Sequence, residues 1–279
     1  MTSEPWRLSL EHVTAFSYGS PARSSFNEVR MVPLTTPRQT TLSAHVSTNP
    51  VASQYRYWDY WGTQVVAFDV ADPHDVLEIR AEAVVDTADR SLRAACTWPE
   101  LDDSSDVFFE ILSPTPSTRP DDRLAAVAES LRQPAPPDTA EAVCEWVHSA
   151  IEYRPGVTGV HTSAAEALAA GQGVCQDLAH VAVSLLRWIG IPARYVSGYL
   201  HPSPEPEVGR SVDGQSHAWI EVWTGGWWEL DPTNLVAVGP RHVAVGRGRD
   251  YSDVSPVRGI YAGGDDDHMS TAVIIVRSR

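Results

Sequence analysis

The chain has 279 residues, of which 43% are hydrophobic and 20% charged, and its acidic residues outnumber its basic ones by 36 to 21. These proportions are typical of a packed globular protein and exclude disorder over most of the chain. The formal net charge of −15 repels phosphate backbones and anionic lipids, so we expect neither nucleic acid nor a membrane as a partner.

The first hundred residues show the alternation of half-buried β-strands. Apolar side chains alternate from Trp6 to Leu10, and further strand-like runs cover residues 64–70 and 76–85. No convincing helical period occurs before about residue 100. Residues 113–120 are rich in proline and small polar side chains, which is typical of a linker. We therefore predict a β-rich N-terminal domain over residues 1–115.

After this segment the apolar spacing becomes helical, at residues 124–131 and again at 143–151. Ser163 and Glu166 form a capping-box pattern, which predicts the start of another helix. A fourth helix is predicted from Cys175 to Ile189, because apolar residues recur there at helical spacing and Gly190 follows as a stop.

Strands return after the fourth helix. They are predicted at residues 193–200, 216–223 and 227–231, and Thr224-Gly225-Gly226 predicts a hairpin between the last two. The tail from residue 242 onward is predicted to form loops and strands. This order, strands followed by helices and strands, indicates an α+β fold.

Cys175 begins the predicted fourth helix, and this position favours reactivity. The unpaired N–H groups and the positive end of the helix dipole stabilise an anion, so they favour the thiolate. An N–H of the same turn can also donate to an oxyanion on a substrate. Many buried cysteines begin helices for packing alone, so the chemistry depends on what lies beside this thiol.

The predicted hairpin brings an imidazole and a carboxylate together. Odd-numbered side chains of residues 216–223, including His217, share one face, and the turn places Asp231 opposite His217 or diagonal to it. Such neighbours have Cβ atoms roughly 4.5–5.5 Å apart when opposite and roughly 7–8 Å apart when diagonal. The carboxylate would orient the ring so that its far nitrogen faces a thiol. An ordinary hairpin with a surface aspartate is the alternative.

Four segments in order resemble the core of the transglutaminase-like superfamily. They are Cys175-Gln-Asp, Gly190-Ile-Pro-Ala-Arg, His217-Ala-Trp-Ile-Glu-Val-Trp and Gly226-Trp-Trp-Glu-Leu-Asp-Pro-Thr. The resemblance covers residues 140–235 and implies a papain-like fold. It also implies that the family's catalytic cysteine, histidine and aspartate correspond to Cys175, His217 and Asp231, with an acyl-enzyme on the thiol.

The N-terminal part is similar to the β-rich region of bacterial transglutaminase-like proteins. The similarity lies in His12-Val-Thr, Asn27-Glu-Val-Arg-Met-Val-Pro and Asp59-Tyr-Trp-Gly, and residues 243–261 are similar to that family's C-terminal part. The resemblance therefore spans nearly the whole chain. It implies a β-rich N-terminal domain followed by a transglutaminase-like catalytic domain over residues 116–279.

We expect from this resemblance a cysteine-dependent hydrolase that cleaves peptide or isopeptide amide bonds of a peptide or protein substrate. His217 would take the thiol proton, and Asp231 would stabilise the resulting imidazolium. Acyl transfer from glutamine to an amine, as in cross-linking transglutaminases, is the first alternative. A non-catalytic binding module is the second, and the intact set of three residues argues against it.

Several neighbouring side chains are expected to support the site. A second donor to the oxyanion is expected among Gln172, Gln176 and Tyr153. Trp219 is expected to shield the His217 imidazole or to pack in the core rather than to contact substrate. Asp177 and His180 are expected to have structural roles, and Glu221 and Glu229 to be solvated or structural.

The other two cysteines and the aspartates at 265–267 are expected to take no part in catalysis or metal binding. Cys96 and Cys144 are expected to be structural, and three scattered cysteines exclude a disulfide framework. Histidine spacing typical of metal ligands is absent, so neither a metal nor a cofactor is expected. Residues 265–267, three aspartates, are expected to form a solvated loop rather than a calcium site.

Specificity is expected to lie in residues 201–215, a proline-rich and acidic loop just before His217. The oligomeric state is left open by the sequence. The N-terminus lacks the pattern of a secretory signal, and no run of about 18 apolar residues occurs, so we expect a cytoplasmic protein with reduced thiols.

Overall fold

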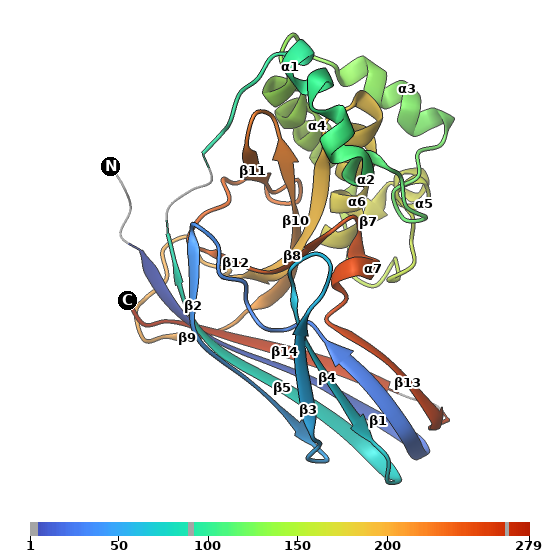
Figure 1. The fold of residues 1–279 in the computed structure, drawn as a ribbon, viewed down its shortest axis with the longest axis vertical. Coiled ribbons are helices and arrows are strands. Elements are labelled where there is room, and N and C mark those ends of the chain that lie inside the picture. The colour runs from blue at the N-terminus through green and yellow to red at the C-terminus, as the bar shows by residue number, and fades with distance from the viewer. Residues whose placement is uncertain (1–4, 89–91, 266–267) are drawn as a thin grey trace.

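The computed structural model describes residues 5–88, 92–265 and 268–279. A large twisted sheet forms one end of the molecule, and a smaller sheet covered by helices forms the other (Figure 1). In the described residues, no helix is both long and apolar enough to span a bilayer. Two of the three aspartates at 265–267, Asp266 and Asp267, lie outside the described residues.

The large sheet is built around one long strand. Its members are β1 (Trp6–Val29), β2 (Gln39–Asn49), β3 (Gln54–Trp58), β4 (Gln64–Val70), β5 (His74–Thr87), β9 (Ser211–Asp213), β13 (Val257–Gly263) and β14 (His268–Arg277). The first half of β1 pairs with β5 and β14, and its second half pairs with β4 and β13. The alternating burial of β1 confirms the predicted strand pattern.

The smaller sheet has the order β11-β10-β8-β12. Its strands are β8 (Ala193–Leu200), β10 (Gln215–Trp223), β11 (Trp227–Leu230) and β12 (His242–Gly248), and a short parallel pair joins β6 (Glu152–Tyr153) to β7 (Gln172–Gly173). The helical segments are α1 (Trp98–Asp103), η1 (Ser105–Phe108), α2 (Phe109–Leu112), α3 (Asp122–Leu131), α4 (Pro136–Ala150), α5 (Ala164–Ala170), α6 (Cys175–Ile189) and α7 (Tyr251–Val254).

Local sequence signals set the bounds of the helices nearest the site. Ser163 and Glu166 form the predicted capping box at the start of α5. Gly171 and Gly190 end α5 and α6 with φ of +65° and +94°, a region that glycine adopts without strain. The helix that begins at Cys175 is therefore confirmed, and its buried face packs in the main hydrophobic core.

Neither sheet is built from one continuous part of the sequence. β9, β13 and β14 come from the C-terminal part and join the large sheet. Leu101 of α1 lies before the predicted division at residue 115, yet it belongs to the core beneath the helices. The boundary between independent folding units at residue 115 stays a prediction.

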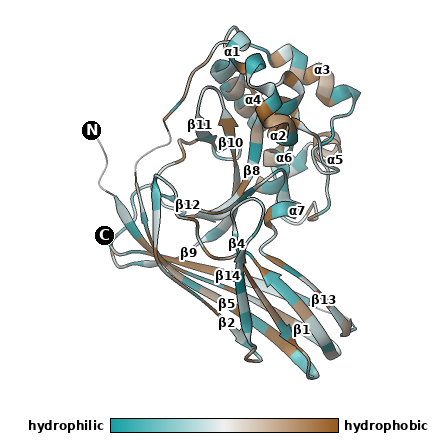
Figure 2. Cartoon of the chain, in the orientation of Figure 1, coloured by the Kyte–Doolittle hydropathy of each residue, from teal (hydrophilic) through white to brown (hydrophobic). Residues whose placement is uncertain are grey.

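An apolar cluster joins the large sheet to the smaller one. β1 contributes Leu8 and Leu10, and β14 contributes Val273 and Ile275, from the hydrophobic stretch visible in Figure 2. They pack against Tyr199, Val243 and Val245 of the smaller sheet. Burial of each aliphatic side chain contributes about 1.5–3 kcal/mol, so this joint fixes one sheet firmly against the other.

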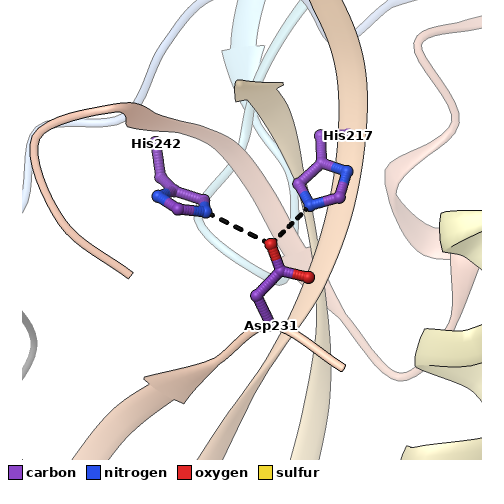
Figure 3. Close-up of side chains that lie close together, drawn as sticks. All are labelled: His217, Asp231 and His242. Carbon is purple, nitrogen blue, oxygen red and sulfur yellow. Dashed lines mark hydrogen bonds and ion pairs between the residues drawn. The ribbon is translucent and has the colours of Figure 1, made fainter. Parts of the chain in front are cut away.

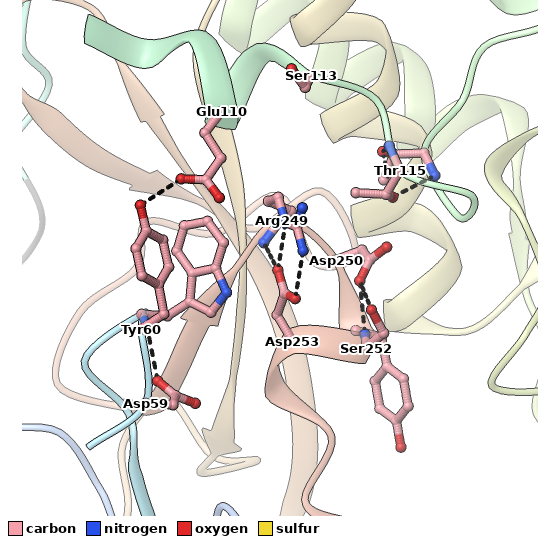
Figure 4. Close-up of polar contacts among 12 residues, drawn as sticks. Asp59, Tyr60, Glu110, Ser113, Thr115, Arg249, Asp250, Ser252 and Asp253 are labelled. Carbon is pink, nitrogen blue, oxygen red and sulfur yellow. Dashed lines mark hydrogen bonds and ion pairs between the residues drawn. The ribbon is translucent and has the colours of Figure 1, made fainter.

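A polar joint ties the β3–β4 turn to the helices (Figure 4). Tyr60 donates its hydroxyl to Glu110 of α2 at 2.7 Å. Arg249 pairs with Asp253 at 3.0 Å and lies over the ring of Trp61, 5.4 Å from the ring centroid. Residues 249–253, which include most of α7, are therefore held between the large sheet and the helical layer.

Substitution of Gln39 measures how much the contact between the two sheets contributes to stability. Its buried amide accepts from the N–H of Ala244 at 2.8 Å and donates to the Ala244 carbonyl at 2.8 Å. We expect Gln39→Ala to lower the free energy of unfolding by about 1–3 kcal/mol, because the N–H of Ala244 loses its acceptor in a buried place. Urea denaturation measures this change.

The control is Gln133→Ala, because the side chain of Gln133 is exposed and bonds only locally, to the carbonyl of Leu131 at 3.3 Å. We expect this change to stay within about 0.5 kcal/mol. Equal losses in the two variants would contradict the proposed role of Gln39.

Candidate active site

His217 and Asp231 come from neighbouring strands of the smaller sheet. β10 and β11 form the predicted hairpin, and Trp223 pairs with Trp227. If the same pairing is extended four residues beyond Trp223 and Trp227, Asp231 lies opposite Trp219 and diagonal to His217. The diagonal position is the second of the two predicted placements. The Nε2 atom of His217 lies 2.8 Å from Oδ2 of Asp231.

The Cys175 thiol meets the same imidazole from helix α6. Cys175 is partly exposed and lines the same cleft as His217. Cys175 is close enough to the imidazole of His217 to raise its pKa. Because Asp231 occupies Nε2, the Nδ1 atom is the ring nitrogen left for sulfur. The structure therefore brings the three predicted residues together.

The electrostatics of this group favour a charged imidazole. Burial lowers the pKa of His217, but hydrogen bonds with Asp231 and Cys175 and their charges outweigh it and raise that pKa to about 9. Burial likewise raises the pKa of Asp231, yet its hydrogen bonds with His217 and His242 hold that pKa well below the usual range. At neutral pH an imidazolium thus lies beside the carboxylate of Asp231, in the cleft that Cys175 lines.

Asp231 is held by five donors (Figure 3 shows the two imidazoles). Oδ2 lies 2.8 Å from His217, 3.4 Å from Nε2 of His242 and 2.9 Å from the amide nitrogen of Asn234. Oδ1 accepts from the backbone N–H groups of Thr233 and Asn234 at 2.9 and 3.1 Å. This full set of partners allows a charged carboxylate to remain buried.

His242 is a member of the site that the sequence analysis missed. Its Nδ1 atom accepts from the N–H of Gly239 at 3.4 Å, so we assign the ring hydrogen to Nε2, which faces Asp231. Burial lowers the pKa of His242, which keeps this imidazole neutral. β12 carries His242 to the site by pairing with β8, and no local sequence signal reveals that pairing. Asn234 was detectable, since Asp-Pro-Thr-Asn is typical of a turn.

Trp219 forms the wall behind the imidazole. Its ring is fully buried and stacks on that of His217, with centroids 6.0 Å apart and an interplanar angle of 26°. The indole N–H donates to Glu229 at 3.2 Å, and Glu229 pairs with Arg38 from the N-terminal part. Glu229 is therefore structural, one of its two expected roles. The loop that carries Arg38 supports the site from behind.

The three candidate donors to an oxyanion occupy different places. Gln176 lines the cleft, and its amide lies 3.4 Å from the carbonyl of Val160. Gln172 accepts from Arg154 at 3.1 Å. Tyr153 is half-exposed, and both burial and the charge of the nearby thiol raise its pKa.

Other polar residues near the thiol are buried and structural. Asp177 accepts from the N–H of Val174 at 2.8 Å and thereby caps α6, and it also accepts from Thr158 at 2.6 Å. His180 accepts from the N–H of Tyr251 at 3.1 Å. These contacts agree with the structural roles expected for both residues.

Glu221 is buried between Arg194 and Arg247. It is therefore structural, which was one of its two expected roles. The other two cysteines also behave as structural residues. Cys144 is buried in the main core, and Cys96 packs against it. Burial raises the pKa of both thiols.

A cleft of about 270 Å³ opens at Cys175 and His217. The expected specificity loop does not line it: within the described chain, none of residues 201–215 is among the lining residues. Part of that loop instead forms β9, which pairs with β14 at the edge of the large sheet. The prediction missed this because a three-residue strand leaves no recognisable alternation.

The ligand atoms of His217, Asp231 and His242 lie within 4.8 Å of one another, close enough for a metal ion to bridge. Each of these atoms already has a hydrogen-bond partner in the group, so the arrangement is complete as a hydrogen-bonded set.

Comparisons with known proteins identify the family and the fold of the chain. Residues 125–232 match the model of the transglutaminase-like superfamily, and residues 8–86 match that of the bacterial transglutaminase-like N-terminal region. The uncharacterized protein ML0607 of Mycobacterium leprae is 46% identical over 278 residues, which cover 98% of this chain and 99% of that protein. A protein-glutamine gamma-glutamyltransferase of Pseudomonas aeruginosa is 33% identical over 126 residues, 41% of this chain and 19% of that one.

A solved structure shares the fold. It is that of a proposed cysteine protease from Cytophaga hutchinsonii, which superposes with a TM-score of 0.81 at 23% identity and covers 100% of this chain and 93% of that one. The predicted α+β class, with a β-rich N-terminal region before the transglutaminase-like core, is confirmed.

The charge state of His217 gives a direct test by histidine NMR titration. We expect a pKa near 9 in the wild type and a markedly lower value in Asp231→Asn, because burial is then opposed by Cys175 alone. His242→Gln, which keeps an amide donor beside the carboxylate, should leave the pKa of His217 raised. A wild-type His217 that titrates near about 6.5 would contradict the assignment.

The same shift affects stability. Because the folded pKa lies above the unfolded value, the stabilisation is complete below pH about 6.5 and is lost as the pH rises through about 9. The expected loss is on the order of 3 kcal/mol.

Proposed function

This chain belongs to the transglutaminase-like superfamily, and on that premise we propose that it is a cysteine-dependent hydrolase of peptide or isopeptide amide bonds. The proposed nucleophile is Cys175, with His217 as acid and base and Asp231 as the orienting carboxylate. The observation that carries the proposal is a partly exposed thiol at the start of α6 beside an imidazole whose pKa is raised to about 9.

In the proposed resting state the proton of the Cys175 thiol already lies on Nδ1 of His217, so a thiolate faces the imidazolium before the first half-reaction begins. The thiolate attacks the amide carbonyl carbon and forms a C–S bond, and the carbonyl oxygen becomes an oxyanion. As the C–N bond breaks, the imidazolium returns the proton to the departing amine. The thioester on Cys175 remains, and Asp231 holds the ring in place throughout.

The second half-reaction resolves the thioester with water. His217 takes a proton from water, the hydroxyl oxygen bonds to the acyl carbon, and sulfur departs with the proton from the ring. The partial exposure of Cys175 favours this outcome, because solvent reaches the acyl carbon. This exposure is the reason to place hydrolysis before transfer to an amine.

Two groups are proposed to stabilise the oxyanion. The first is a backbone N–H in the first turn of α6, where N–H groups lack partners within the helix. The second is the side-chain amide of Gln176, because this residue lines the cleft whereas Gln172 and Tyr153 are not among its lining residues. Loss of one such donor typically lowers kcat by about 10²–10³-fold.

Transfer of the acyl group to an amine remains the second candidate. The similarity to the P. aeruginosa protein-glutamine gamma-glutamyltransferase over 126 residues favours it. A purely binding module is disfavoured by the interacting cysteine, histidine and aspartate. We also propose a cytoplasmic location, because a reducing compartment keeps the Cys175 thiol free to react.

Product analysis separates these functions. A glutamine-containing peptide library is offered with and without a primary amine, and mass spectrometry follows both the products and any adduct on Cys175. We expect hydrolysed products and a thioester at Cys175, and a loss of at least about 10³-fold in kcat in Cys175→Ala.

Cys96→Ser is the matched control, since its thiol packs against the core away from the cleft. It should keep its activity. Amine-containing products as the main species would replace hydrolysis by transfer, and turnover that persists in Cys175→Ala would remove the thiol mechanism altogether.

A further inference from the structure

The large sheet extends into the cleft that holds the thiol. The face of β1 that carries Leu8 and Leu10 into the apolar joint continues to His12 and Thr14. The face of β14 that carries Val273 and Ile275 continues in the opposite direction, to Thr271 and Met269. These polar or flexible residues line the same cleft as Cys175 and His217: His12, Thr14, Met269 and Thr271. One wall of the cleft therefore belongs to the large sheet.

A buried hydrogen-bond chain orients this wall. The Nδ1 atom of His12 lies 2.9 Å from the hydroxyl of Tyr199, and Nε2 lies 3.0 Å from Oγ1 of Thr271 and 3.2 Å from Oγ1 of Thr14. Burial lowers the pKa of His12 to about 4, so the ring is neutral at physiological pH.

The donor and acceptor roles in this hydrogen-bond chain leave one hydroxyl hydrogen that can be donated to a ligand. We assign Nδ1 of His12 as the acceptor from the Tyr199 phenol, so that Nε2–H donates to Thr271. The hydroxyl hydrogen of Thr271 is then available to another acceptor. Thr271 is exposed, whereas Thr14 is buried, so Thr271 is the member of the chain that a substrate reaches.

Apart from the imidazolium of His217, which is paired with Asp231, the cleft is lined by uncharged side chains. The chain has 57 charged residues in total (36 acidic and 21 basic), yet none of the 15 described residues that line the cleft is Asp, Glu, Arg or Lys. A charged side chain that entered would lose water and find no unpaired counter-charge, because the one cation, His217, is already paired with Asp231, and this is unfavourable. The volume of about 270 Å³ lies just below the roughly 300–1,000 Å³ of pockets for drug-sized ligands, so it suits one side chain with its flanking peptide groups.

We propose that this wall of β1 and β14 is the subsite that selects an uncharged peptide segment beside the reacting amide. Met269 contacts the side chain of the substrate, and Thr271, oriented by His12, donates to a substrate carbonyl. The inference rests on the proposed function and extends it to a substrate class. It also makes the large sheet part of the active site rather than an appended domain.

Binding and turnover of three capped tripeptides test the proposal. Each has a central glutamine, flanked by two alanines, two glutamates or two arginines. Dissociation constants are measured by calorimetry on the Cys175→Ala protein, and kcat/KM on the wild type. We expect the alanine peptide to exceed both charged peptides by at least tenfold in each measurement. Equal binding of the three peptides would overturn the proposal.

Met269→Arg, introduced on both backgrounds, should bring the glutamate peptide to at least the level of the alanine peptide, because it places a cation in the subsite. Ile274→Arg is the matched control, since Ile274 is an exposed residue on the opposite face of the same strand. It should leave the order of the three peptides unchanged. The same switch in both variants would show a general charge effect and overturn the assignment of Met269.

Thr271→Val tests the proposed hydrogen bond. We expect KM for the alanine peptide to rise about three- to tenfold with kcat nearly unchanged, and Thr271→Ser to restore KM. An unchanged KM would remove Thr271 from the subsite. If peptides bind in this order without turnover, the subsite stands and the proposed hydrolysis fails, so the two failures are distinguishable.

Discussion

The buried carboxylate of Asp231 is the group on which the rest of the site depends. An unpaired anion with this burial would be costly, and five donors satisfy it instead. Its hydrogen bond and charge, together with those of Cys175, outweigh the burial that would otherwise keep His217 neutral, and so a cation lies in the cleft beside Cys175. Without that charge, the helix terminus would be the main influence favouring a thiolate.

The residues around Asp231 come from elements that are distant in sequence. Helix α6 presents the thiol, β10 and β11 present the ion pair, and β12 adds His242. The large sheet supports them from two sides. Arg38 and Gln39 brace the back of the site, while β1 and β14 form one wall of the cleft. An arrangement of this kind explains why the C-terminal strands return to the N-terminal sheet.

Local chemistry explains what the sequence could predict. Capping residues and glycines marked α5 and α6, and the Gly225-Gly226 turn placed Asp231 within reach of His217. Non-local pairing explains what it could not. His242 reaches the carboxylate only because β12 pairs with β8. Alternation along β1 indicates which side chains are buried, but not that His12 faces the cleft. Residues 201–215 were expected to form a loop that sets specificity, yet their short strand β9 joins the large sheet.

The most direct measurement is the rate at which each thiol reacts with iodoacetamide at pH 7, with sites resolved by mass spectrometry. If the imidazolium held by Asp231 activates Cys175, this thiol reacts at least about tenfold faster than Cys96 or Cys144, and Asp231→Asn removes most of the advantage. Reaction of Cys175 at the rate of Cys96, or an advantage that Asp231→Asn leaves intact, would contradict the account.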